Sequence, residues 1–191
     1  MNMNMNMNMN NGIISVVNAG CNWVCYLIRS LDSNCTYIGS TNNMPKRLNA
    51  HNSTSPSRKG AKRTCGQTWA PIVVVSGFHH KNACLSFETG WKRLAKYRSN
   101  TKLNLINCMA ELNLRYDKDT HWNRIIDLLF FMHNFTLLGT KYKLNYKQIH
   151  PFNMPDLLTI NIFLNNWIEQ LPWPYFVKLS YISHASLTID H

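Results

Sequence analysis

Carboxylates are scarce in the first half of this 191-residue chain. Residues 1–100 contain two acidic residues, Asp32 and Glu88, against twelve lysines and arginines, whereas residues 101–191 contain seven acidic residues against eight basic ones. The formal net charge of +11 therefore resides almost entirely in the first half. Such an asymmetry predicts a polyanionic partner, either nucleic acid or an anionic membrane surface. The simpler alternative is that the charge only keeps the protein soluble.

Long apolar runs and paired cysteines are also missing. The most apolar run, Ile125–Met132, contains Asp127 and is much shorter than the about 20 residues of a bilayer span. The N-terminus has neither the basic region nor the apolar core of a secretory signal, so we expect an intracellular protein without a membrane segment. None of the six cysteines forms a C-x-x-C pair, which argues against a zinc finger or RING and favours reduced, partly buried thiols.

Composition divides the chain into three parts. Residues 1–20 begin with a Met-Asn repeat and are expected to be a disordered tail. Residues 21–99 carry the strand and helix patterns described next, and residues 100–191 form a less basic, helix-rich extension of unknown role. In the extension the pattern predicts a helix over 122–132, an exposed strand or hairpin over 142–146, a second helix over 157–168, and a strand or arm over 176–182.

The segment 21–99 alternates strand-like and helix-like patterns. Two apolar segments, 23–28 and 35–39, flank turn residues and predict a hairpin, and the β-branched run in 71–77 predicts a third strand. Between them, Pro45 suits the first turn of a short helix, on which Arg47 and His51 share a face because they are four residues apart. A longer helix is predicted over 82–97.

Five side chains of this segment could together hydrolyse a phosphodiester. Glu88 could hold one Mg²⁺ ion, with water and phosphate completing the octahedron. Arg47 could clamp the phosphate oxygens with its planar fork. Tyr26, Tyr37 or His51 could take the proton from water, although a tyrosine would need its pKa lowered from about 10.

Each of these residues also has a structural alternative. Glu88 could pair with Lys92 four residues later, at about 0.3–0.5 kcal/mol. The tyrosines could be core rings with satisfied hydroxyls, and the histidine could be structural. The polar loop that follows the short helix is a DNA-backbone clamp or a solvated surface; its basic residues are Arg58, Lys59, Lys62 and Arg63.

The order and spacing of these residues resemble the GIY-YIG nuclease superfamily. The second family tripeptide is intact as Tyr37-Ile38-Gly39, and the first keeps only its tyrosine in Val24-Cys25-Tyr26. Within the superfamily the chain looks most similar to the catalytic subunit of the Slx structure-specific endonuclease. That similarity rests on Gly60-Ala61-Lys62-Arg63-Thr64 and on Phe87-Glu88-x-x-Trp91.

The resemblance implies an α+β fold, with a small three-stranded, mostly antiparallel sheet flanked by helices. It implies a divalent ion (Mg²⁺ or Mn²⁺) on Glu88, Tyr26 as general base assisted by Tyr37, Arg47 on the scissile phosphate, and His51 in support. The implied activity is cleavage of branched DNA, namely flaps, forks and Holliday junctions, in DNA repair and recombination.

One departure from the Slx pattern concerns partners. No cysteine follows Cys108, so the RING that engages a scaffold protein in that family is missing, which argues against such a partner. Two alternatives stay open: a homing or restriction enzyme that recognises sequence, in linear duplex DNA, and a nucleic-acid-binding protein that has lost catalysis. The expected location is the nucleus or the DNA-replication compartment of a virus-infected cell.

Overall fold

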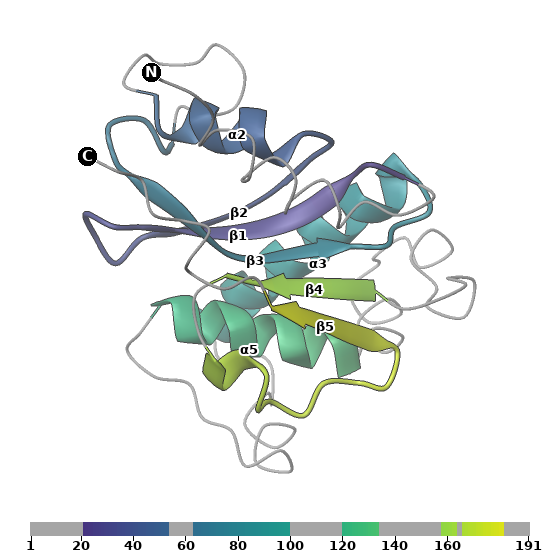
Figure 1. The fold of residues 1–191 in the computed structure, drawn as a ribbon. Coiled ribbons are helices and arrows are strands. Elements are labelled where there is room, and N and C mark those ends of the chain that lie inside the picture. Colours follow the sequence, from purple (N-terminus) through teal and green to yellow (C-terminus); the bar gives the residue numbers. More distant parts are fainter. Residues whose placement is uncertain (1–20, 54–62, 100–119, 134–157, 164–165, 182–191) are drawn as a thin grey trace, which may run out of the picture.

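A mixed five-stranded sheet runs through the middle of the molecule (Figure 1). The computed structural model describes residues 21–53, 63–99, 120–133, 158–163 and 166–181. The sheet order is β2-β1-β3-β4-β5, in which β4 and β5 are parallel and every other pair is antiparallel. The strands are β1 (Val24–Ser30), β2 (Thr36–Thr41), β3 (Trp69–Ser76), β4 (Leu158–Ile162) and β5 (Val177–Tyr181).

Within the described ranges, three α-helices and a short 3₁₀ helix pack against the sheet: α2 (Met44–His51), α3 (Lys81–Ser99), α5 (Thr120–His133) and η3 (Asn166–Ile168). The start of α2 follows from its sequence, because the Asn43 side chain accepts a hydrogen bond from the Lys46 amide at 2.9 Å and Pro45 occupies the first turn. The end of α2 is tied to β3 through Asn52, whose amide oxygen and nitrogen bond the backbone N–H and C=O of Trp69. These contacts fix the helix above the hairpin.

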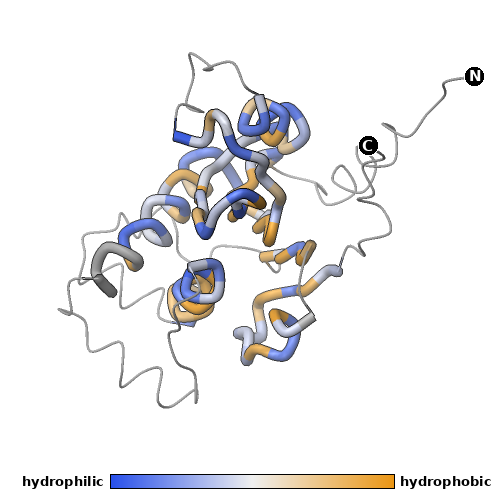
Figure 2. Tube along the Cα trace, turned by 90° about the vertical axis from the view of Figure 1, so that its left-hand side faces the viewer, coloured by the Kyte–Doolittle hydropathy of each residue, from blue (hydrophilic) through white to orange (hydrophobic). Residues whose placement is uncertain are grey.

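The two faces of the sheet bury different sets of residues. On the face under α3 and α5 lies the main core, which includes Leu27, Phe87 and Trp91. On the α2 face a smaller core gathers around Tyr26 and Trp69. In Figure 2, hydrophobic residues colour much of α5 and of the strands, in line with the burial of all of Ile125–Met132. Alternation along each strand therefore decides which side chains reach the α2 face.

The α+β architecture and the elements of 21–99 agree with the prediction. The helix over 82–97 is α3, and its stripe of Cys84, Phe87, Trp91 and Leu94 is buried as expected. The helix over 122–132 is α5, and the last predicted segment is the strand β5. The five described cysteines are free thiols.

Two predictions are corrected. The sheet has five strands, not three, because β4 pairs with the outer edge of β3 and β5 pairs with β4. The helix predicted over 157–168 is instead β4 followed by the single turn η3. Leu158, Ile160 and Ile162 alternate with polar residues and fill the core beside β3, so the need to pair that edge outweighed the helical spacing.

Several predictions fall outside the described residues: the tail 1–20, the segment 142–146, and the loop residues Arg58, Lys59 and Lys62. Within the described ranges, none of the helices combines the length and apolarity that a bilayer span requires.

Candidate active site

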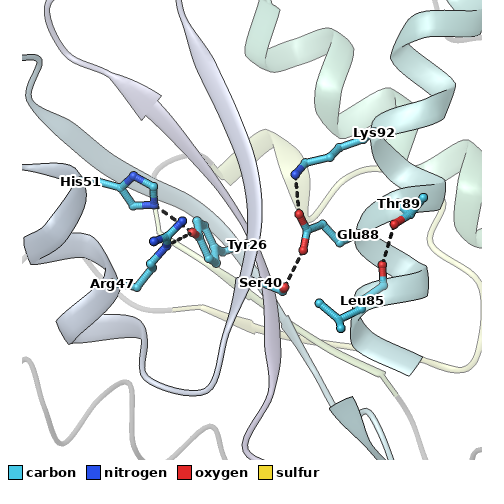
Figure 3. Close-up of polar contacts among 8 residues, drawn as sticks. All are labelled: Tyr26, Ser40, Arg47, His51, Leu85, Glu88, Thr89 and Lys92. Atoms are coloured by element: carbon cyan, nitrogen blue, oxygen red, sulfur yellow. Dashed lines mark hydrogen bonds and ion pairs between the residues drawn. The ribbon is translucent and has the colours of Figure 1, made fainter. Parts of the chain in front are cut away.

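Tyr26 is the centre of a hydrogen-bonded group on the α2 face. Its ring projects from β1 toward α2 and is fully buried. The Arg47 Nε atom donates to the Tyr26 hydroxyl oxygen at 2.9 Å, and the His51 Nε2 atom lies 2.8 Å from the same oxygen (Figure 3). The four-residue spacing on α2, which predicted a shared face for the arginine and the histidine, brings both to one phenol.

His51 is held from its other side by Thr64. The His51 Nδ1 atom lies 2.7 Å from the Thr64 hydroxyl, and the Thr64 carbonyl accepts a hydrogen bond from the Trp69 indole N–H at 2.8 Å. His51 is fully buried, so it reaches a substrate only through Tyr26. Sequence reasoning did not assign a role to Thr64, although it lies in the Gly60–Thr64 stretch that carried the family resemblance.

The protonation states of the group follow from its burial. Burial, together with the nearby charge of Arg47, lowers the pKa of His51 to about 4, so the imidazole is neutral near pH 7. Burial also raises the pKa of Tyr26, and the hydrogen bond and charge of Arg47 offset only part of that effect. Burial alone would lower the pKa of Arg47, but its interactions with Tyr26 and Tyr37 outweigh this and raise it. The group therefore combines a neutral phenol, a neutral imidazole and a fixed cation.

Tyr37 and Gly39 complete this face from β2. The Tyr37 ring centroid lies 5.1 Å from that of His51 and 6.4 Å from that of Tyr26. Gly39 pairs with Tyr26 across the hairpin, and a Cβ atom at Gly39 would lie 2.5 Å from the Tyr26 hydroxyl oxygen and 2.8 Å from Cε1 of Tyr37. Only glycine leaves room for both tyrosines, which gives the Tyr37-Ile38-Gly39 tripeptide a physical reason.

Glu88 approaches β2 from α3, on the other side of the sheet. The Ser40 hydroxyl donates to Glu88 Oε2 at 2.5 Å, and the Lys92 ammonium pairs with Oε1 (Figure 3). Ser40 follows Gly39 in β2, so its side chain points to the α3 face while Tyr37 points to the α2 face. The ion pair with Lys92, which was the structural alternative for Glu88, is present.

Two observations connect Glu88 with the tyrosine group across β2. Lys92 Nζ lies 5.3 Å from the Tyr37 ring centroid as well as against Glu88. The negative charge of Glu88 also contributes to the raised pKa of Tyr26, although less than burial does. Within the described part of the chain Glu88 makes no hydrogen bond to Arg47 or Tyr26, and the carboxylate and the phenol lie on opposite faces of the sheet, with the edge strand β2 between them.

The residues around Glu88 fit a hard divalent cation held by few protein ligands. Its side chain is 16% exposed and has the Ser40 hydroxyl beside it. Among the described residues no group of three or more His, Cys, Asp or Glu side chains comes together. One carboxylate, with water and phosphate oxygens as further ligands, suits Mg²⁺, which keeps several waters when bound. Lys92 would have to release the carboxylate first.

The remaining site prediction concerns the basic loop. Arg63 is exposed at the edge of the described residues, just before Thr64. Arg58, Lys59 and Lys62 lie outside the described residues, as noted above.

Comparisons with known proteins agree with the resemblance seen in the sequence. Residues 22–104 match the model of the GIY-YIG catalytic domain. Uncharacterized protein L300 of Acanthamoeba polyphaga mimivirus is 59% identical over 162 residues, which are 85% of this chain and 98% of that protein.

Fungal endonuclease subunits are similar over shorter stretches. The structure-specific endonuclease subunit SLX1 of Phaeosphaeria nodorum is 44% identical over 73 residues, covering 37% of this chain and 19% of the relative. The subunit slx1 of Schizosaccharomyces pombe is 34% identical over 117 residues, covering 54% and 42%. The chain thus spans less than half the length of either subunit.

Proposed function

Because this chain belongs to the GIY-YIG family, we propose that it is a structure-specific DNA endonuclease that hydrolyses phosphodiester bonds in branched DNA with one divalent metal ion. The observation that carries the proposal is the pairing of Arg47 and His51 on the Tyr26 hydroxyl, with Glu88 on the other side of the same edge strand. The similarity to SLX1 subunits supports flaps, forks and Holliday junctions as substrates.

In the proposed reaction the arginine and the tyrosine act on one phosphate. The charge of Arg47 is secured by its raised pKa, so its guanidinium can bind the non-bridging oxygens while Nε keeps its bond to Tyr26. Glu88 would hold Mg²⁺ or Mn²⁺, which supplies Lewis-acid stabilisation of the charge that develops on the phosphate. Lys92, displaced from Glu88 but still beside Tyr37, would remain within reach of the DNA backbone.

The proton of the attacking water is proposed to pass through Tyr26 to His51. The phenol is protonated before substrate arrives, so it accepts a proton only as its own leaves. The acceptor at hand is the Nε2 atom of the neutral His51, 2.8 Å away, with the Thr64 hydroxyl accepting from Nδ1–H. A bound phosphate would neutralise Arg47, which removes one of the two effects that lower the pKa of His51.

The basic loop is proposed to grip the DNA backbone next to this site. Four positive charges would come from Arg58, Lys59, Lys62 and Arg63, and Thr64 joins that loop directly to His51. Because each neutralised phosphate releases counterions, binding should weaken steeply with added salt. The similarity to a mimivirus protein supports action where viral DNA is replicated.

The test compares cleavage of flap, fork, four-way junction and linear duplex DNAs of shared sequence. Glu88→Gln should abolish Mg²⁺-dependent nicking of the branched DNAs and leave their binding within about threefold, because the amide keeps the shape but loses the charge that holds the ion. Glu169→Gln, which changes an exposed carboxylate elsewhere, is the matched control and should cut at the original rate.

Undiminished cutting by Glu88→Gln would contradict the proposal. Equal cleavage of linear and branched DNAs would instead favour a sequence-recognising endonuclease, and binding without turnover in either metal would favour a protein that has lost catalysis.

A further inference from the structure

We propose that a pocket beside the β1–β2 turn binds a second phosphate group of the DNA, away from the bond that is cut. The turn and one end of α5 lie on the same side of the molecule (Figure 1). The pocket between them has a volume of about 300 Å³. It is lined by Arg29, Ser30, Leu31, Ser33, Asn34, Cys35 and His121. None of these residues belongs to the Tyr26 group or contacts Glu88.

Arg29 is the residue that points to an anionic ligand. It is half-buried at the end of β1, and its Nε atom is sealed from solvent without a hydrogen-bond partner. No hydrogen bond or ion pair joins a side-chain nitrogen of Arg29 to a described residue, and the two terminal nitrogens, unlike Nε, are not buried. Because a half-buried guanidinium normally has an acceptor, an unpaired one lining a pocket indicates a partner that comes from solution.

The surroundings of Arg29 favour an oxyanion over a carboxylate of the protein itself. No acidic residue lines the pocket. The neighbouring carboxylate, Asp32, is engaged elsewhere, since its Oδ2 accepts the Thr68 amide at 2.5 Å. The first turn of α5 contains no acid, contributes His121 to the lining, and places the positive end of the helix dipole beside the pocket. Arg124, in the same turn, bonds Thr36 at 3.4 Å and lies 4.0 Å from Asp127.

The position of the pocket fits a second contact to the same DNA, an assignment that rests on the proposed nuclease function. Arg29 follows Tyr26 in β1 by three residues and points to the same face of the sheet as Cys25, which lies four residues before it. Cys25 pairs with Ser40 of β2, and the Ser40 hydroxyl bonds Glu88. Four residues of strand span about 13 Å, at roughly 3.3 Å per residue. The same length of duplex DNA, which rises by about 3.4 Å per base pair along its axis, carries several phosphates. A DNA arm that leaves the cut site along the hairpin would thus present a phosphate to Arg29.

The first experiment tests the pocket without any nuclease assay. Inorganic phosphate is titrated against the full chain, and ³¹P line broadening and thermal unfolding are recorded for the original protein, Arg29→Gln, and Asn34→Trp. Asn34 is exposed on the pocket rim, so tryptophan there fills the pocket while Arg29 and the core stay intact. Lys178→Gln, the same charge change at an exposed site on β5, is the control. Broadening and the thermal shift should be smaller in both pocket variants than in the original protein and the control, and the remainder should come from phosphate bound at Arg47.

The second experiment identifies the source of the phosphate. Affinity for a flap DNA is measured in Ca²⁺ at several salt concentrations, and the slope of log K against log salt should become shallower by about 0.9 in Arg29→Gln, as expected for one lost phosphate contact. The slope should be unchanged in Lys178→Gln.

The outcomes separate the pocket from the nuclease proposal. Equal phosphate binding by Arg29→Gln, Asn34→Trp and the original chain would overturn the site. Phosphate binding that depends on Arg29, with an unchanged DNA slope, would overturn the assignment to DNA and leave a site for a free oxyanion. Neither result depends on whether Glu88→Gln cuts.

Discussion

Single side chains decide how the two tyrosines, the arginine and the histidine come together. The sequence predicted that Arg47 and His51 share a face, because helical spacing is a local rule, and in the structure both bond the Tyr26 hydroxyl. It could not identify Ser40 or Thr64, because their contacts to Glu88 and His51 join residues 48 and 13 positions apart in the sequence. Such contacts are set by packing, which no spacing rule encodes.

Gly39→Ala should separate the two tyrosines and reduce activity. The new methyl group would meet the Tyr26 hydroxyl at 2.5 Å, so the phenol must move away from Arg47 and His51. We expect kcat for a flap DNA to fall by at least about tenfold, with a loss of stability of about 1–3 kcal/mol from overpacking.

Gly90→Ala is the matched control for this change. A Cβ there would overlap the ring of Phe131, in the core between α3 and α5. It should lower the free energy of unfolding by a comparable amount and leave kcat near its original value at a temperature where both variants are folded. Equal losses of kcat in the two variants would show that Gly39 acts through stability alone.

At the scale of elements, the hairpin, α2, β3 and α3 were predictable and β4 was not. The first four have caps, turns or alternation within their own segments, such as Asn43 and Pro45 at the start of α2. The segment 158–162 has apolar residues that suit either a helix or a strand. Its conformation is decided by β3, whose outer edge would otherwise have unpaired backbone groups.

Ile160→Ala should therefore destabilise the whole domain. Ile160 is fully buried in the main core, and removal of its side chain should lower the free energy of unfolding by about 2–5 kcal/mol, measured by urea denaturation. Thr159→Ala, at a half-buried position of the same strand, should change it by less than about 1 kcal/mol. A separate early transition confined to 120–181 would contradict the view that β4 belongs to the same cooperative unit.

At the scale of the whole molecule, the burial of one titratable group links folding to pH. The folded chain holds His51 neutral with a pKa of about 4, whereas an unfolded histidine has a pKa near 6.5. The unfolded chain therefore binds the additional proton first as the pH falls. The stability that depends on a neutral His51 is therefore fully present above about pH 6.5, and the free energy of unfolding falls progressively between about pH 6.5 and pH 4.

Between about pH 6.5 and pH 4 the free energy of unfolding should fall by about 3 kcal/mol, at about 1.36 kcal/mol per pKa unit. Urea denaturation at half-unit steps of pH would measure it. In His51→Gln, which cannot titrate, the dependence of unfolding free energy on pH should flatten over the same interval. An equal slope in both proteins would show that other groups produce the acid sensitivity.

The pairing of β1 with β2 decides which side chains of β2 point to each face of the sheet, because successive residues of a strand alternate between the faces. Tyr37 and Gly39 of β2 face α2, whereas Ser40 faces α3. A shift of the pairing by one residue would exchange the faces of β2, so the Tyr37 phenol and the Ser40 hydroxyl that bonds Glu88 would trade sides, while Tyr26 in β1 would stay in place. A shift by two would restore the faces but displace β2 by about 6.6 Å along β1. A slip of the hairpin would therefore part Glu88 from the Ser40 hydroxyl and move Tyr37 away from His51, although the bonds of Arg47 and His51 to Tyr26 involve no residue of β2.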